Sequence, residues 1–327
     1  MNALKETKKK HLLAILKYLY LHNSSTMNEL VENLQLSQPS IRNMVRTLQE
    51  KQLIQEVGND LSSGGRCPTR FALNENNYLI LCLYVQVDKV IYQLRNFNEI
   101  KKESILFYQS EDELKKTIKD LIDQEKIHCC QIAVEGIVYE DVYVTDHHNV
   151  LEKHRWLKDI KKEINIPLQL QNDVKMIHQG CYFTYQQDST YYLYINEVGI
   201  GSSYFYKDEP LYGRSGIMGE IGLISLKGKT INQQIRECQN QEEFNEILSL
   251  LLSIVFTMID PKRLELSLDL KWRYEENIIE KVLNEINQSC FENLYFHEDV
   301  SSMLFDGLVY RGVVYLLKER IERNEKI

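Results

Sequence analysis

The sequence predicts an α/β protein in which a small helical head precedes a larger body of alternating strands and helices. Three observations predict this architecture. Apolar residues recur at helical spacing over 6–22 and 26–50, two short alternating runs then flank a glycine-rich segment, and strand and helix patterns alternate afterwards. A chain of 327 residues is long enough for two or three domains, and we expect a head over 1–75 and a body over 76–327.

The composition excludes a disordered chain and argues against a membrane span. Hydrophobic residues make up 43% of the sequence and charged residues 26%, which suits a folded domain with a sizeable core. The apolar stretch Ile247–Ile259 is shorter than the roughly 20 residues of a membrane helix, so it predicts a buried helix. The N-terminus lacks the apolar core of a signal peptide. We therefore expect a cytoplasmic protein without a membrane partner.

The cysteines favour a reducing compartment. There are seven of them, an odd number, scattered apart from the pair Cys129-Cys130, and no CxxC motif occurs. We expect buried thiols rather than disulfides.

Charge is distributed unevenly along the chain. The net charge is −8, but residues 1–75 hold ten Lys and Arg against seven Asp and Glu, a net of +3, and the remainder carries −11. A mildly basic head on an acidic body fits a module that reads DNA joined to a part that does not touch it. Chance fluctuation is the alternative explanation.

The head begins with a helix over 6–22 and continues with two short helices. Thr26 and Glu29 have the spacing of a capping box at the start of the first short helix. Ser37 can cap the second, where Pro39 is tolerated in the first turn. This second helix has an apolar face and a polar face. The apolar face consists of Ile41, Met44, Val45 and Leu48, and the polar face of Gln38, Ser40, Arg42, Asn43 and Arg46.

Two short helices joined by a tight turn predict a helix-turn-helix. Polar residues gather at the start of its second helix, where a recognition helix meets base edges in the major groove. Arg and Asn side chains can make bidentate contacts with guanine and adenine. The alternative is a plain three-helix bundle with a solvated polar face.

A glycine-rich hairpin follows the helices. Residues 53–57 and 69–73 alternate like strands, and the segment between them contains Gly64, Gly65 and Arg66. Glycines let a backbone approach DNA closely, and an Arg side chain can then enter a narrow minor groove. The hairpin therefore predicts a wing, and with it a winged helix-turn-helix.

The residues of the head resemble those of a known family. The run from Leu36 to Ile54, the segment from Ser63 to Pro68 and Phe71–Asn74 resemble the ROK repressors, whose members include regulators of xylose and N-acetylglucosamine genes. Weaker matches follow in the body. They are Asn172-Asp173, Gly199-Ile200-Gly201, Gly213 to Gly222, Ile259 to Leu264 and Gly307 to Tyr315.

The resemblance implies an actin-like, ribonuclease-H-like body of two α/β lobes around a cleft. The patterns in the body agree with alternating strands and helices. We expect strands at 78–87, 89–95, 131–134, 168–171 and 190–197, and helices at 111–124, 156–164, 174–187 and 241–258.

The resemblance also raises the question of sugar-kinase activity. In ROK kinases the first strand of the body ends in a glycine-rich loop that holds ATP phosphates, and such a cradle needs backbone N–H groups. The matching stretch here, Val85–Val90, contains no glycine. The segment Gly199-Ile200-Gly201 could act as a second phosphate loop, although a simple turn is the favoured interpretation. We expect a protein that is not an enzyme, with no catalytic residue and no cofactor.

Four residues are candidates for binding an effector. By resemblance, Asp173 occupies the position of the catalytic base and Glu220 that of a sugar contact, and both could hydrogen-bond a sugar without catalysis. Gly136 matches the start of a sugar-side loop, although residues 137–140 depart from the Gly-Pro pattern of the family. Asn172 completes the set. The alternative is that Asn172 and Asp173 only cap the helix that follows.

A structural zinc site is not expected. The family has a His shortly after the matched Glu and then a cysteine cluster, whereas residues 223–245 contain one cysteine, Cys238, and no His. Tetrahedral zinc needs four ligands. The adjacent His147 and His148 beside Asp146 are interpreted as a solvated pair rather than a metal site.

These observations leave two main hypotheses for function. The first is a DNA-binding regulator of carbohydrate metabolism, expected to be a repressor. It would bind a palindromic operator as a homodimer or dimer of dimers and respond to a sugar effector. The second is a regulator whose body has lost sugar and ATP binding and only dimerises or contacts a protein. An active sugar kinase is the least favoured.

Overall fold

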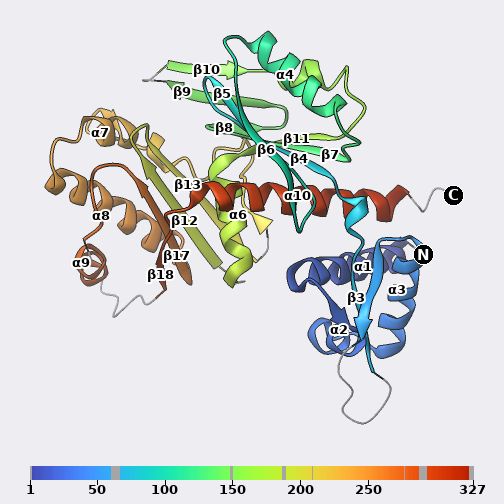
Figure 1. Ribbon diagram of the computed structural model, residues 1–327. Helices are drawn as coiled ribbons and strands as arrows, with labels where there is room; N and C mark the ends of the chain where they lie inside the picture. The colour runs from blue at the N-terminus through green and yellow to red at the C-terminus, as the bar shows by residue number, and fades with distance from the viewer. Residues whose placement is uncertain are drawn as a thin grey trace.

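The computed structural model describes residues 2–59, 67–147, 150–185, 189–207, 209–275, 277–286 and 293–323. It has three parts, which are a head at the N-terminus and two lobes (Figure 1). Each of the two lobes is built on a five-stranded sheet. The predicted α/β class is confirmed.

The head contains three helices and a small antiparallel sheet. The elements are α1 (Asn2–His22), α2 (Met27–Leu34), α3 (Gln38–Glu50), β1 (Ser25–Thr26), β2 (Ile54–Asn59) and β3 (Thr69–Leu73), with strand order β1-β3-β2. The predicted capping box is present, because the Glu29 N–H donates to Thr26 Oγ1 and the Thr26 N–H donates to Glu29 Oε2 at 2.8 Å. Ser37 caps α3, and Pro39 lies in its first turn, as predicted.

The first lobe contains a mixed sheet with strand order β11-β7-β4-β5-β6. Its strands are β4 (Ile80–Val85), β5 (Lys89–Arg95), β6 (Ile100–Phe107), β7 (Cys129–Val134) and β11 (Leu168–Asn172). Helices α4 (Glu111–Asp123) and α5 (Trp156–Ile160) cover one face. A second small sheet follows β7 and comprises β8 (Ile137–Tyr139), β9 (Val142–His147) and β10 (Val150–His154).

The second lobe repeats this plan with strand order β14-β13-β12-β17-β18. Its strands are β12 (Ser189–Asn196), β13 (Ile200–Tyr206), β14 (Glu209–Pro210), β17 (Arg263–Asp269) and β18 (Leu294–Phe296). Helices α7 (Ile231–Glu237), α8 (Gln241–Met258) and α9 (Asn277–Glu285) pack on one face. The short elements are η1 (Glu75–Asn77), η2 (Ile221–Leu223), β15 (Ser225–Leu226) and β16 (Lys229–Thr230).

Two helices, α6 (Asp173–Tyr185) and α10 (Val300–Arg323), lie between the lobes (Figure 1). Their backbones approach closely because glycine occupies both contact points. A Cβ on Gly180 would lie 2.1 Å from the carbonyl oxygen of Met303, and one on Gly307 would lie 2.0 Å from that of Met176. By length and composition α10 could cross a membrane, but 61% of its apolar window is buried. We interpret α10 as a core helix.

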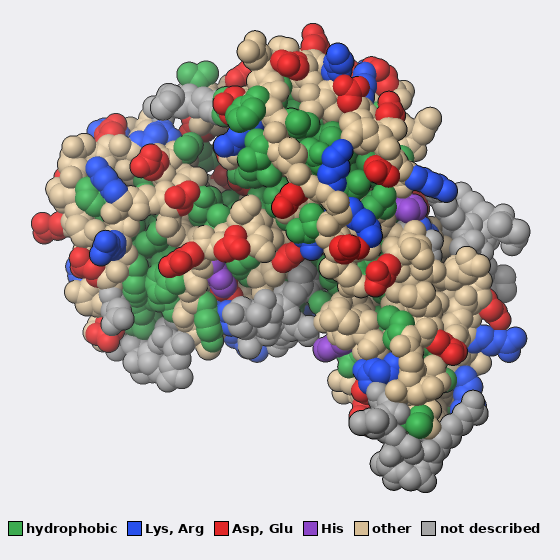
Figure 2. All heavy atoms as spheres, in the orientation of Figure 1, with side chains coloured by type: hydrophobic (Ala, Val, Ile, Leu, Met, Phe, Trp, Pro, Cys, Tyr) green, Lys and Arg blue, Asp and Glu red, His purple; other side chains and the backbone are tan. Residues whose placement is uncertain are grey.

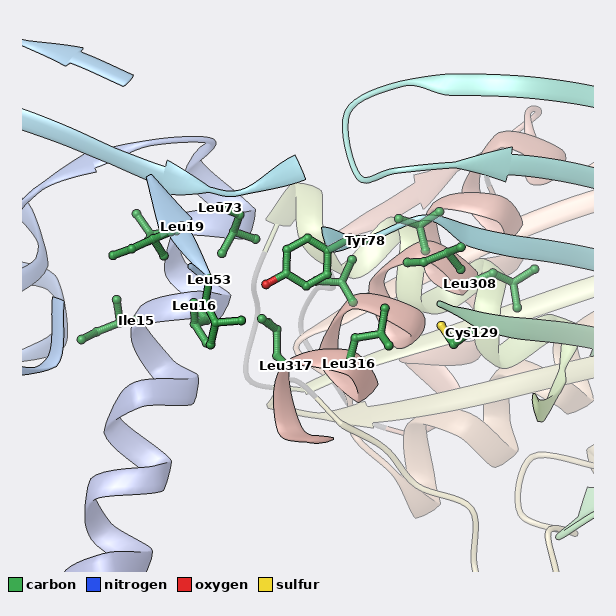
Figure 3. Close-up of a cluster of buried hydrophobic side chains, with 14 of the residues drawn as sticks. Ile15, Leu16, Leu19, Leu53, Leu73, Tyr78, Cys129, Leu308, Leu316 and Leu317 are labelled. Carbon is green, nitrogen blue, oxygen red and sulfur yellow. The ribbon is translucent and has the colours of Figure 1, made fainter. Parts of the chain in front are cut away.

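The head shares its apolar core with the body. Leu16 and Leu19 of α1 belong to the same buried cluster as Tyr78 and as Leu316 and Leu317 of α10 (Figure 3). The predicted boundary at residue 75 falls at η1, and the cluster continues across it.

The expected strands and helices of the body are all present, with shifts at their ends. The strand expected at 78–87 is shorter, and the helix expected at 156–164 ends at Ile160. No prediction from the sequence covered β6, the sheet β8–β10, β13, β14, β17, β18 or the helices α7, α9 and α10. The described cysteines are free thiols as expected; Cys67 is half-buried and the others are buried.

Candidate functional site

The exposed face of α3 is the first candidate site. Ile41, Met44, Val45 and Leu48 are buried and fix the helix on the head. The predicted contact residues all point to solvent. They are Gln38, Ser40, Arg42, Asn43 and Arg46. The structure therefore places these five side chains together on one accessible surface.

Two of the five side chains have partners within the head. The Ser40 hydroxyl lies 2.8 Å from the Ser37 hydroxyl and belongs to the helix cap. Arg46 Nε donates to Glu50 Oε1 at 2.9 Å, with 80% and 62% of the two side chains exposed. An exposed pair of this kind contributes only about 0.2–1 kcal/mol, so Arg46 can leave Glu50 at little cost.

Arg70 has a structural role that the sequence analysis missed. Its guanidinium donates two hydrogen bonds to the Glu29 carboxylate, both 3.2 Å, and Nε donates to Ser24 Oγ. These bonds tie β3 to α2. The Thr26 backbone N–H and the Ser25 hydroxyl add to them and lower the pKa of Glu29. The proposed wing residues Gly64, Gly65 and Arg66 lie outside the described residues.

The second candidate site is a cleft of about 190 Å³ between the two lobes. It is lined by all four of the residues expected to bind an effector, Gly136, Asn172, Asp173 and Glu220. These residues are far apart in the sequence and meet because β7, β11 and the segment before η2 end at the same place.

Asn172 shapes the cleft through backbone contacts. Its Oδ1 accepts from the Lys175 N–H at 2.9 Å, so it caps α6 as the alternative interpretation held. Its Nδ2 donates to the carbonyl oxygen of Gly136 at 2.8 Å. Gly136 has a φ of +100°, and a Cβ there would lie 2.2 Å from the carbonyl oxygen of Val144. Asn172 and Gly136 thus form the turn at the base of the cleft.

A group of carboxyls lies on the floor of the cleft. The Tyr84 hydroxyl lies 3.1 Å from Glu135 Oε1 and 3.5 Å from Asp173 Oδ2. Burial, followed by the nearby Glu135, raises the pKa of Asp173 to about 8. Burial also raises the pKa of Glu220, against the effect of Lys175. At neutral pH Asp173 is therefore mostly protonated and can donate a hydrogen bond. Glu135 was not predicted from the sequence.

The glycine turn at 199–201 does not offer a phosphate cradle. Asn196 Oδ1 accepts from the N–H groups of Val198 and Gly199 at 3.0 and 2.9 Å. Asn232 Oδ1 accepts from the Ile200 N–H at 2.8 Å. Because side-chain oxygens already occupy these donors, a phosphate would have to displace them. The favoured interpretation as a turn agrees with this geometry.

The β4–β5 connection also lacks such a cradle. The Gln86 N–H donates to the Lys89 carbonyl at 2.9 Å and closes a tight hairpin. Val87, in this turn, presents an exposed isopropyl group to the cleft.

One group of possible metal ligands occurs among the described residues. Ligand atoms of Cys181, Glu265 and His297 lie within 4.8 Å of one another. The Glu265 carboxylate contacts the buried guanidinium of Arg263, which already neutralises its charge. Burial raises the pKa of the Cys181 thiol and so disfavours the thiolate that a metal needs. The side chains of His147 and His148 lie outside the described residues.

Part of the body matches a known family model. Residues 96–249 match the model of the ROK family. The xylose repressor of Staphylococcus xylosus is 24% identical over 229 residues, which cover 64% of this chain and 58% of the repressor, so the match spans little more than half of that relative.

Solved structures of ROK proteins share the fold. A crystal structure of a ROK family transcriptional regulator, described as a homologue of the Escherichia coli Mlc protein, superposes with a TM-score of 0.66 at 15% identity and covers 94% of this chain and 99% of its own. A ROK hexokinase of Thermus thermophilus gives a TM-score of 0.51 at 11% identity, covering 72% of this chain and 97% of its own. The chain therefore shares the fold of ROK proteins, and its residues 96–249 match the ROK family model.

Proposed function

We propose that the protein is a transcriptional regulator of the ROK type, a cytoplasmic repressor that binds double-stranded DNA through its head. The observation that carries the proposal is α3, whose buried apolar face and exposed polar face are separated cleanly. The similarity to a xylose repressor and to the fold of a ROK regulator supports it. The head projects from the body, where a duplex could approach it (Figure 2).

In this proposal the head is a winged helix-turn-helix. Helices α2 and α3 form the helix-turn-helix, and β2 and β3 form the base of the wing. Gln38, Ser40, Arg42, Asn43 and Arg46 contact base edges in the major groove, and Arg66 enters the minor groove. A homodimer or dimer of dimers places two heads on the half-sites of a palindromic operator.

A ligand in the cleft would change the position of the heads through the segment that follows β13. Glu220 lies at one end of this segment. At the other end Glu209 pairs with Arg311 of α10 at 3.0 Å and approaches Lys17 of α1 at 3.9 Å. Arg311 also donates to the Tyr212 hydroxyl at 2.7 Å. The coupling requires a ligand that binds the two arrangements with different affinity.

Loss of kinase activity accompanies this proposal. Phosphoryl transfer depends on positioned phosphates, whereas the described N–H donors of the 199–201 turn already bond to Asn196 and Asn232. The hexokinase among the fold relatives keeps a sugar kinase as the second candidate. ADP formation with a panel of hexoses and pentoses would reveal it.

Fluorescence anisotropy tests DNA binding. The purified protein is titrated with a labelled duplex from the intergenic region upstream of its own gene, with a scrambled duplex as reference and across a salt series. Specific binding should exceed non-specific binding by about 10³-fold or more and weaken steeply with salt. The double variant Arg42→Ala/Asn43→Ala should lose the sequence preference. Lys116→Ala, which removes an exposed charge from α4, should retain it.

A further inference from the structure

The charges around the cleft select against anionic ligands. Its described lining contains the carboxyls of Glu135, Asp146, Asp173 and Glu220 and no Lys or Arg. Two cations beside the lining are already bonded. Lys175 Nζ donates to the Met218 carbonyl at 3.1 Å. Arg236 Nη1 donates to the Val198 carbonyl at 2.8 Å and lies 3.9 Å from the Asp146 carboxylate. A phosphate group would therefore meet a described lining of carboxyls without a Lys or Arg, beside cations that are already bonded.

The mouth of the cleft is apolar. Val87, Leu151 and Val198 line it and are 68%, 67% and 53% exposed. They come from the β4–β5 turn, strand β10 and the β12–β13 turn, so both lobes contribute. Figure 2 shows the molecule hollowed between these lobes. Large apolar side chains that converge on one cavity from separate segments are typical of a binding surface.

The polar and apolar parts of the cleft are segregated by depth. Asn172 and Asp173 are only 5% and 6% exposed and lie with Glu135 on the floor. The apolar side chains surround the opening. A ligand that satisfies both regions carries hydroxyl groups at one end and an apolar group at the other.

We propose that the cleft binds a neutral glycoside with an apolar aglycone and rejects phosphorylated sugars. The sugar ring lies against Asp173, Glu135 and Glu220, which exchange hydrogen bonds with its hydroxyls. The aglycone lies between Val87, Leu151 and Val198, in the region where a kinase would hold nucleotide phosphates. This inference rests on the proposed function as a ligand-responsive regulator.

Isothermal titration calorimetry on the full-length protein tests the inference. The probes are the p-nitrophenyl β-glycosides of glucose, xylose, galactose and N-acetylglucosamine, each beside its parent sugar, together with glucose 6-phosphate. At least one aryl glycoside should bind ten-fold or more tightly than its parent sugar, and glucose 6-phosphate should not bind. If no aryl glycoside exceeds its parent, or if the sugar phosphate binds more tightly, the proposal is overturned.

Variants separate the two ends of the ligand. Val87→Ser/Leu151→Ser should abolish the preference for the aryl group and leave the affinity for the parent sugar within two-fold. Glu220→Gln should weaken both ligands ten-fold or more. Met258→Ser, at an equally exposed apolar position away from the cleft, should change neither. Equal aryl preference in the Val87→Ser/Leu151→Ser protein would contradict the assignment of the mouth.

The DNA assay keeps this inference distinct from the proposed function. Sequence-specific DNA binding without any aryl preference would overturn only the ligand class. Failure of specific DNA binding, with glycoside binding intact, would overturn the regulator and leave the cleft as a glycoside site.

Discussion

In the head, the residues that set the structure are close together in the chain, whereas the cleft draws its floor from segments far apart. Thr26 and Glu29 cap α2 across three residues, and Ser37 caps α3 in the same way. The cleft instead joins Glu135, Asp173 and Glu220, which come from different elements of both lobes. A change in the head should therefore act locally, and a change in the packing between the lobes should act on the whole fold.

The largest effect is expected for a substitution that breaks the packing of α6 against α10, on which the cleft depends. Gly307→Ala places a Cβ 2.0 Å from the Met176 carbonyl oxygen, and backbone cannot move aside without separating α6 from α10. The gain of about 1 kcal/mol in helix propensity cannot offset this clash. We expect a loss of more than about 4 kcal/mol in the free energy of unfolding, measured by urea denaturation.

Gly58→Ala in the head is the matched control. Nothing lies within 4 Å of the position that a Cβ would take on Gly58, and only its φ of +142° opposes the substitution. Strain at such a position costs on the order of 1–3 kcal/mol. If Gly58→Ala and Gly307→Ala lose the same free energy of unfolding, the head is no less sensitive to substitution than the packing between the lobes, which contradicts the comparison.

The next largest effect is expected on the pH dependence of stability, through the Asp173 carboxyl on the cleft floor. Folded Asp173 keeps its proton up to a pH of about 8, whereas an unfolded Asp releases it near pH 4. The folded state therefore holds more protons between these values, and its stability falls as the pH rises through that window and is level above it. Asp173→Asn removes this dependence. It should stabilise the protein at pH 8 by on the order of 2–5 kcal/mol and have little effect at pH 4.

Denaturation at pH 4, 6 and 8 measures this difference, with Asp123→Asn on the exposed end of α4 as the control. A stabilisation of equal size at all three pH values would show that the titration of Asp173 does not cause it. Asp173→Asn also tests whether a change on the cleft floor leaves the head unaffected. The sequence-specific affinity of the head for DNA should stay unchanged in this variant.

Local signals made most of the head predictable from the sequence. Capping residues, helical periodicity and strand alternation lie within a few residues of the contacts they make, and the bounds of α3 and β3 follow from them. The salt bridge of Arg70 with Glu29 did not follow, because it links residues 41 apart through the fold.

The cleft was predictable only through the family resemblance. That resemblance marked Gly136, Asn172, Asp173 and Glu220, and the structure brings them together. Glu135 and the apolar mouth carried no local signal, since a carboxylate after a strand and three exposed aliphatic side chains are ordinary features of a surface. The strand β17 was missed although its sequence RLELSLD alternates apolar and polar residues, and β13 was missed because IGSSYFY contains a Gly and two Ser near its start, which are not typical of a strand.

A smaller effect is expected for Arg46 on the exposed face of α3. Arg46→Ala should weaken specific DNA binding by about 5- to 150-fold, the range of one good base contact of about 1–3 kcal/mol. Stability should change by less than about 1 kcal/mol, because the pair with Glu50 is exposed. Anisotropy with Arg214→Ala as the control for charge measures the effect. Equal weakening on the scrambled duplex would assign Arg46 to phosphate contacts instead.

The smallest effect is expected at the cap of α2. Thr26→Ala removes the side-chain acceptor for the Glu29 N–H, and loss of such a cap costs about 0.5–2 kcal/mol. Because Glu29 also anchors Arg70, part of the cost should come from loosening β3 against α2. Thr26→Ser keeps the acceptor and should recover most of the lost stability. If Thr26→Ser is as unstable as Thr26→Ala, the buried methyl group matters more than the cap, and the head depends on core packing at this position as the cleft does.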